Sequence, residues 1–234
     1  MVKKKQKRFD ESESFSNYFQ PNYTEIIKGI PLKGKWNKDF FKNENPICLE
    51  LGCGKGEYTI ALAQKYPDRN YIGIDIKGAR LWRGCKTSIE ESMQNVAFIR
   101  AKIELIEYFF DEKEISEIWI THPDPQPRKS RSKKRLTSPR FLNRYLHILK
   151  ENSLVHLKTD DFPLYQYTLD VVKTNKHELL FKTDDLYALN PKEEDVMITQ
   201  TFYEKIFLKE GKKINYLRLK HNMNESVINE TNED

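Results

Sequence analysis

Residues 46–56 have the sequence PICLELGCGKG, in which a short apolar run leads into three closely spaced glycines. An apolar run that ends in glycines is typical of a buried parallel strand. Residues 56–66 then carry apolar side chains at helical spacing, and Pro67 ends that pattern. We therefore predict a strand, a glycine-rich turn and a helix, which together begin an α/β fold.

The same alternation continues along the chain. Further strands are expected over residues 70–76, 96–101, 115–121, 153–159, 177–183 and 214–219, and helices over 77–92, 103–110, 138–150 and 162–174. Strands separated by helices in this way form right-handed βαβ units with a parallel sheet. Ligands of such sheets bind at the carboxyl ends of the strands.

The turn itself consists of Glu50 followed by a GxGxG pattern. Gly52 and Gly54 allow the backbone to turn sharply and bring a ligand against the N-terminus of the next helix. A dinucleotide site would have its third glycine one residue later, where this chain has Glu57. The carboxylate of Glu50 would repel a phosphate group but attract the cationic methionine portion of S-adenosylmethionine.

Asp75 ends the second predicted strand, 25 residues after Glu50. A carboxylate at this place can accept hydrogen bonds from both ribose hydroxyls of an adenosine. The two acids therefore favour S-adenosylmethionine as the cofactor. An NAD-dependent oxidoreductase is the alternative that the glycine spacing and Glu50 disfavour.

The fourth strand of this series runs into the loop THPDPQPRK, residues 121–129. Proline fixes its own φ and pushes the preceding residue towards extended backbone. Three prolines in five residues are therefore expected to hold Asp124 rigidly at the cofactor end of the sheet. The alternative is a stiff linker in which this aspartate has no role.

A basic run follows this loop directly, with six basic residues among the eight from Arg128 to Arg135. Charge runs are usually solvated surfaces. Beside a catalytic loop, however, this one could hold a phosphate backbone near the methyl donor without reading sequence. RNA is thus the expected class of substrate.

Length and composition set the wider limits. The chain has 234 residues, of which 38% are hydrophobic and 32% charged, and a net charge of +5. We expect one domain over 46–220, a basic N-terminal tail and extension over 1–45 with a disordered lysine cluster, and a disordered acidic tail over 221–234. Three cysteines without metal spacing, and no apolar segment of membrane length, favour a cytoplasmic protein with no metal site and no membrane partner.

Two later motifs complete the pattern: Lys158-Thr159-Asp160 and Thr201-Phe202-Tyr203-Glu204. Together with the PDP loop and the basic run they resemble the bacterial tRNA (guanine-N7-)-methyltransferase family over residues 47–219. The resemblance implies a Rossmann-like class I methyltransferase fold, an α/β fold with a seven-stranded, mostly parallel sheet and helices on both faces. It implies methyl transfer from S-adenosylmethionine to N7 of a guanosine in the tRNA variable loop, position 46 in tRNA numbering, by a monomer or homodimer.

The resemblance also assigns the site residues. For the cofactor these are Glu50, Gly52, Gly54, Asp75, Lys102 and Asp124, the last also being the catalytic position. Substrate contacts are assigned to Arg128, Asp160, Thr201, Phe202, Tyr203 and Glu204, and RNA contacts to Ser130, Arg131, Ser132, Lys133, Lys134 and Arg135. Lys102 stands where class I methyltransferases usually have Asp or Asn towards adenine. Gln126 stands where the tRNA (guanine-N7-)-methyltransferase family more often has Trp, and Arg128 where Lys is common.

A mechanism follows as a hypothesis. N7 of guanine carries a lone pair and no proton, so catalysis needs positioning and electrostatics and no general base before attack. Asp160 and Glu204 are expected to accept hydrogen bonds from the Watson–Crick edge of an extruded guanine, and Asp124 to hold the base in line. The alternatives are another RNA base, a protein amine as acceptor, or a noncatalytic RNA-binding protein.

Overall fold

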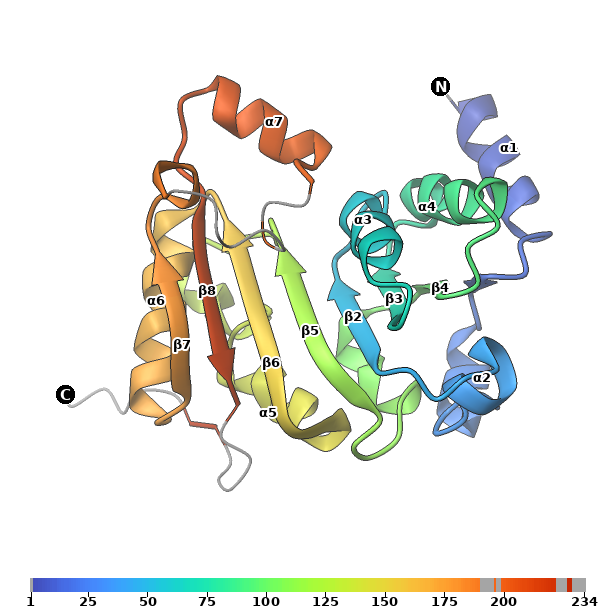
Figure 1. The fold of residues 1–234 in the computed structure, drawn as a ribbon, viewed down its shortest axis with the longest axis horizontal. Coiled ribbons are helices and arrows are strands. Elements are labelled where there is room, and N and C mark those ends of the chain that lie inside the picture. The colour runs from blue at the N-terminus through green and yellow to red at the C-terminus, as the bar shows by residue number, and fades with distance from the viewer. Residues whose placement is uncertain (1, 190–195, 197–198, 222–226, 229–234) are drawn as a thin grey trace.

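The computed structural model describes residues 2–189, 196, 199–221 and 227–228, which form one eight-stranded sheet covered by helices on both faces (Figure 1). The strands are β1 Tyr18–Phe19, β2 Ile47–Leu51, β3 Asn70–Asp75, β4 Val96–Arg100, β5 Ile115–Thr121, β6 Leu149–Thr159, β7 Glu178–Thr183 and β8 Asn215–Lys220. The predicted α/β class with a mostly parallel sheet is confirmed, and the seven expected strands are all present.

The strands lie in the order β1-β4-β3-β2-β5-β6-β8-β7. Among the strands of the described residues, β8 runs opposite to all the others and pairs antiparallel with β6 and β7. The chain order reverses between β2 and β5, which pair in parallel. In open sheets of this kind the crevice beyond the carboxyl ends of the strands at such a reversal is where ligands bind.

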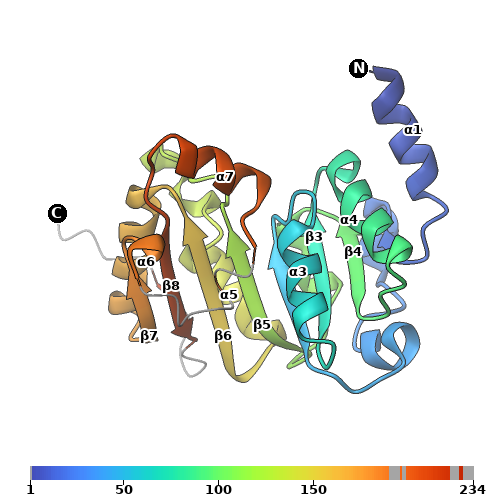
Figure 2. The same cartoon turned by 45° about the horizontal axis from the view of Figure 1, so that its top comes forward.

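Helices cover the sheet on two sides (Figure 2). One side carries α3 Glu57–Lys65 and α4 Gly78–Glu90, and the other carries the 3-10 helix η2 Ile103–Tyr108, α5 Pro139–Ile148 and α6 Phe162–Thr174. Successive β2 residues point to opposite sides, so that Cys48 packs in one buried cluster and Leu49 in the other. Because both faces are covered, all five β2 residues are buried.

The N-terminal region is more ordered than predicted. It forms α1 Val2–Ser12, β1, α2 Tyr23–Lys28 and a π-helix, η1 Trp36–Phe41. The expectation of a disordered lysine cluster is wrong, because α1 packs on α4: the Glu11 carboxylate accepts hydrogen bonds from Trp82 Nε1 at 2.8 Å and Lys86 Nζ at 2.7 Å. The two-residue β1 pairs with β4 and brings the sheet to eight strands.

The C-terminal tail is described only in part. Asn143 exchanges two hydrogen bonds of 2.8 Å with the backbone of Val227, and Asn175 pairs in the same way with Ile228. These two tail residues are therefore held against α5 and α6, contrary to the prediction of disorder, while 222–226 and 229–234 lie outside the described residues. No helix among the described residues is long and apolar enough to cross a membrane.

The remaining elements lie at the carboxyl end of the sheet. They are the 3-10 helices η3 Lys129–Lys134 and η4 Leu186–Ala188 and the helix α7 Phe202–Lys209. In Figure 1, α7 lies beyond the arrowheads of β5 and β6, so that it stands over the crevice where a ligand is expected.

Candidate active site

The glycine turn after β2 can be built only with glycine at its end. Gly56 has φ +72°, and a Cβ there would lie 2.5 Å from the ring of Phe98. Gly54 has φ +58°, and its N–H donates to Asp75 Oδ2 at 3.0 Å. This hydrogen bond ties the turn after β2 to the end of β3. The two strand ends can approach this closely because glycine carries no side chain.

Asp75 lies at the rim of the crevice. Its Oδ1 accepts from the N–H of Lys77 at 2.7 Å and its Oδ2 from Gly54. A carboxylate has about four acceptor positions, so two positions stay open for a ligand. The backbone bonds hold the carboxylate in place, which suits recognition of a pair of hydroxyls.

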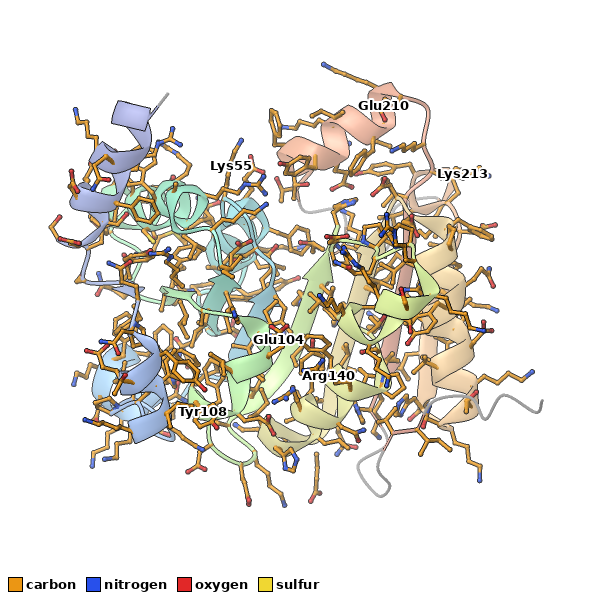
Figure 3. The ribbon with its side chains drawn as sticks, turned by 180° about the vertical axis from the view of Figure 1, so that it is seen from behind. Lys55, Glu104, Tyr108, Arg140, Glu210 and Lys213 are labelled. Carbon is orange, nitrogen blue, oxygen red and sulfur yellow. The ribbon has the colours of Figure 1, made fainter. Side chains whose placement is uncertain are left out.

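A cavity of about 470 Å³ lies beside Asp75, between the strand ends and the loop after β5. Its apolar wall comes from Ile76, Ala101, Ile103, Leu136 and Phe141, and its polar groups include Asp75, Lys102, Glu104 and Asp124. Glu104 is labelled in Figure 3, which views the molecule from behind. The size and the mixture of apolar walls with a few polar groups suit a nucleoside-like ligand.

A second pocket lies beneath α7 and shares Gly52, Arg80 and His122 with the first. Glu50 borders this pocket, where it accepts hydrogen bonds from the N–H of Thr59 at 2.8 Å, from the Thr59 hydroxyl, and from the Thr121 hydroxyl at 2.6 Å. Burial raises the pKa of Glu50 to about 7, although these hydrogen bonds act against that rise.

The loop after β5 is held in one shape by its own residues. His122 and Gln126 have φ of +46° and +47°. The exposed Asp124 accepts a hydrogen bond from the N–H of Gln126 at 3.1 Å. The guanidinium of Arg135 donates to the carbonyls of Pro125 at 3.2 Å and Gln126 at 3.3 Å. The loop is thus braced from two directions. The extended backbone expected before each proline is wrong for His122 and Gln126, whose positive φ turns the chain at both places.

A buried ion pair supports α7. Lys158, at the end of β6, and Glu204, in the first turn of α7, are fully buried with Nζ and Oε1 2.7 Å apart. The Tyr187 hydroxyl donates to Glu204 at 2.7 Å, and Lys158 donates to the carbonyl of Val196 at 2.7 Å. Burial lowers the pKa of Lys158, whereas His122 and Lys158 outweigh burial and lower that of Glu204.

Known proteins resemble this chain over nearly all of the site. A family model described as "Putative methyltransferase" matches residues 44–217. A tRNA (guanine-N(7)-)-methyltransferase of Christiangramia forsetii is 53% identical over 219 residues, which cover 93% of this chain and 98% of the relative. That of Porphyromonas gingivalis is 47% identical over 208 residues, covering 88% and 84%. The chain belongs to the tRNA (guanine-N(7)-)-methyltransferase family.

Solved structures agree at the level of the fold. The crystal structure of the 16S rRNA methyltransferase KamB superimposes with a TM-score of 0.60 at 13% sequence identity, covering 78% of this chain and 91% of that one. The overall fold of this member of the tRNA (guanine-N(7)-)-methyltransferase family is therefore shared with a solved methyltransferase structure.

The basic run separates into two kinds of residue. Arg128, Lys129, Arg131, Lys133 and Lys134 are exposed along η3, where a phosphate backbone could reach them. Arg135 is half-buried instead. Its guanidinium lies 4.2 Å from the centre of the Tyr167 ring and donates to the loop carbonyls. The guanidinium of Arg135, which was assigned to RNA, thus bonds to the loop that carries Asp124.

The Thr201–Glu204 motif forms a capping box in this tRNA (guanine-N(7)-)-methyltransferase family member. Thr201 Oγ1 accepts from the N–H of Glu204, whose carboxylate in turn accepts from the N–H of Thr201. The Glu204 carboxylate is therefore turned inwards, and it does not face either pocket as a reader of a guanine edge would. The hypothesis that Glu204 accepts hydrogen bonds from the Watson–Crick edge of guanine is therefore wrong.

The two aromatic residues of this motif face outwards and fasten α7 across the second pocket. Phe202 lies with its ring centre 3.9 Å from Lys55 Nζ, and its N–H donates to Glu57 at 2.8 Å. The Tyr203 hydroxyl accepts from Arg80 at 2.9 Å. Lys55, labelled in Figure 3, projects from the turn after β2 towards α7.

Asp160 and Lys102 are the remaining assigned residues. Asp160 is partly exposed at the end of β6, and Lys212 lies on it with Nζ 3.2 Å from Oδ2. Lys102 is exposed at the start of η2 with extended backbone, and it borders the first cavity, where its N–H or side chain can meet a ligand. Both are placed where contact with a bound molecule is possible.

Three residues of this site were not anticipated: Arg80, His122 and Lys212. Lys158 was noted as part of the Lys158-Thr159-Asp160 motif, but no role was assigned to it. A lysine within an apolar strand, as in SLVHLKT, is the one available signal, because lysine is almost never fully buried unless it is paired. Its partner is 46 residues away in sequence, and pattern alone could not identify it.

Proposed function

We propose that this chain transfers the methyl group of S-adenosylmethionine to N7 of a guanosine in the variable loop of tRNA. The observation that carries the proposal is the position of Asp124, on a loop braced by Arg135, between the cavity bordered by Asp75 and the exposed basic helix η3. A methyl donor and a polyanionic substrate would meet at this point.

The residues present fit the cofactor. The Asp75 carboxylate has acceptor positions for the ribose hydroxyls, the apolar side chains of Ile76 and Ile103 suit the adenine ring, and Glu50 supplies negative charge near the cationic methionine end. When bound, the cofactor supplies an electrophilic methyl group on a sulfonium. Attraction between Glu50 and that cation is greatest when Glu50 is ionised.

The protein then positions the guanosine. Arg131 and Lys133 bind backbone phosphates, which orients the RNA without selecting a base. Asp160 accepts hydrogen bonds from the Watson–Crick edge of an extruded guanine. Asp124 holds the ring in line, and its charge offsets the positive charge that develops on the methylated base. No group of the protein needs to remove a proton before attack, because N7 has none.

The test is direct. The protein is incubated with S-adenosylmethionine carrying a labelled methyl group and with unmodified tRNA, and the product is digested to nucleosides. Labelled 7-methylguanosine is expected, and a transcript with adenosine in place of the variable-loop guanosine should stay unlabelled. Label in protein, or in a different nucleoside, would overturn the proposal; absence of label together with tight tRNA binding would favour a noncatalytic RNA-binding protein.

A further inference from the structure

His122 lies where the catalytic loop leaves the sheet. It directly follows β5, its N–H donates to the carbonyl of Lys158 at 2.7 Å, and its φ of +46° turns the chain out of the strand. The side chain is 6% exposed. It borders both the cavity beside Asp75 and the pocket beneath α7. No other side chain of the catalytic loop borders both.

Each ring nitrogen of His122 faces a carboxylate. Nδ1 lies 3.5 Å from Asp160 Oδ1, and Nε2 lies 3.6 Å from Glu204 Oε2. An ionised carboxylate only accepts hydrogen bonds, and a neutral imidazole has one N–H and one lone pair. A neutral ring would direct its lone pair at one of the two acids, whereas an imidazolium donates a hydrogen bond to Asp160 and attracts the charge of Glu204, whose Oε2 lies just beyond hydrogen-bond distance of Nε2.

We propose that protonated His122 is a positioning residue of the methyl-transfer site, whose ring joins Asp160 at the end of β6 to Glu204 in α7. The inference rests on the proposed function, because the start of α7 borders the second pocket and Asp160 is the residue proposed to contact the guanine. Loss of the ring proton breaks one of the two links. On its inner side, Glu204 of α7 then keeps the Lys158 ion pair and the hydrogen bond from Tyr187.

The charges around the ring support this state. From β6 come Asp160 and Lys158, and from α7 comes Glu204. Lys212, which follows α7, forms an ion pair with Asp160 and offsets part of its negative charge. Glu50, on β2, accepts a hydrogen bond from the hydroxyl of Thr121, the residue before His122. Burial alone would lower the pKa of His122, and Lys158 acts in the same direction. The two carboxylates facing the ring nevertheless outweigh both and raise that pKa above its ordinary value.

The sign of the pH dependence follows. A histidine whose pKa is raised in the folded protein keeps its links below that pKa and loses them as the pH rises through it. Methyl transfer should therefore decline as the pH rises through a value above 6.5. A merely space-filling ring would give no such decline.

The first experiment needs neither cofactor nor tRNA. The ring nitrogens of the full-length chain, labelled with 15N-histidine, are titrated by NMR, and the His122 signal is identified by its loss in His122→Gln. The ring is expected to titrate above 6.5, with a lower pKa in Asp160→Asn, a partly exposed position that can lose its charge without unfolding the chain. A His122 pKa below 6.5, or one that Asp160→Asn leaves unchanged, would overturn the inference.

The second experiment measures kcat and KM for tRNA between about pH 6 and pH 9. His122→Gln should lower kcat about tenfold at neutral pH, leave KM for tRNA within about twofold, and remove the alkaline decline. His147→Gln, on the exposed side of α5, is the matched control and should keep the decline. If no 7-methylguanosine is formed, the proposed function fails and the NMR titration still decides the role of His122; if methylation occurs without the titration shift, only this inference fails.

Discussion

Asp124 is exposed, yet the loop around it leaves it little freedom. Its side chain already accepts the N–H of Gln126, and the guanidinium of Arg135 fixes the adjoining carbonyls. Such a residue is suited to hold a substrate atom in line, and it adds little to the affinity for a large RNA. Substitution of Asp124 should therefore change the rate of methyl transfer while leaving the affinity for tRNA nearly unchanged.

We expect Asp124→Asn to lower kcat by about a hundredfold or more while the Kd for tRNA changes less than about twofold. Asparagine keeps the turn, because its Oδ1 can still accept the Gln126 N–H. Asp170→Asn, at an exposed position on α6, is the control. Single-turnover methylation and filter binding measure the two quantities, and equal losses in both would show that Asp124 serves binding instead.

Arg135 and Lys133 are both positively charged, but Arg135 is half-buried against the loop after β5 and Lys133 is exposed on η3. Arg135→Ala should lower kcat about tenfold by freeing the carbonyls of Pro125 and Gln126, with little change in the salt dependence of tRNA binding. Lys133→Ala should weaken tRNA binding and leave kcat at saturating tRNA nearly intact. Titrations at several salt concentrations, each paired with a saturating-rate measurement, distinguish the two roles.

Glu50 links pH to stability. Its folded-state pKa of about 7 lies above the ordinary 4.5, so the folded protein binds more protons than the unfolded chain between these values. Stability should therefore fall as the pH rises through this window, by on the order of 3 kcal/mol at most. Thermal unfolding of Glu50→Gln without cofactor, measured from about pH 5 to pH 8, should lack this decline. A parallel decline in both proteins would contradict the assignment.

At the scale of elements, α7 depends on a single buried carboxylate. Lys158→Met leaves Glu204 buried without its cation, and we expect a loss of about 3–5 kcal/mol in the free energy of unfolding. Lys205→Met, exposed on the same helix, should cost less than about 0.5 kcal/mol. Urea unfolding of both variants makes the comparison, and similar losses would show that the ion pair does not support the fold.

The central elements could be predicted from sequence because each carries its own pattern. The apolar run Ile47–Leu51 and the periodic helix Phe162–Thr174 depend on local spacing alone, and their predicted bounds differ from the observed ones by a residue or less. Helix α1 is polar, and its attachment comes from a contact between Glu11 and Lys86 that no local pattern encodes. The two residues of β1 are too few to show alternation.

The site was predictable to the extent that it follows strand ends. Glu50, Asp75 and Asp124 each come directly after or at the end of a strand, and the structure brings all three to the same edge of the sheet. Glu204 was assigned to substrate because the resemblance carries over the whole Thr201–Glu204 motif. A threonine followed three residues later by glutamate, before Ile206 and Phe207, is equally the sequence of a capping box, and that interpretation is the one observed.

At the scale of the whole molecule, the position of the positive charge matters more than its amount. Replacing Lys129, Arg131 and Lys133 with alanine should reduce the slope of log K against log salt by about 2 to 3. Replacing Lys150, Lys173 and Lys176 removes the same charge near the opposite end of the sheet and should leave the slope nearly unchanged. Equal effects of the two triple variants would mean that tRNA responds to net charge alone.

The place of β8 has a consequence for how the protein is made. β8 is the last strand in sequence, yet it lies between β6 and β7 and pairs with both. On a ribosome, β7 emerges before the strand that connects it to the sheet, and Lys158 emerges well before Glu204. A nascent chain that ends before Asn215 can form the glycine turn and the cavity beside Asp75, but it lacks the strand that completes the sheet. Full catalytic competence therefore comes only after β8 has been synthesised.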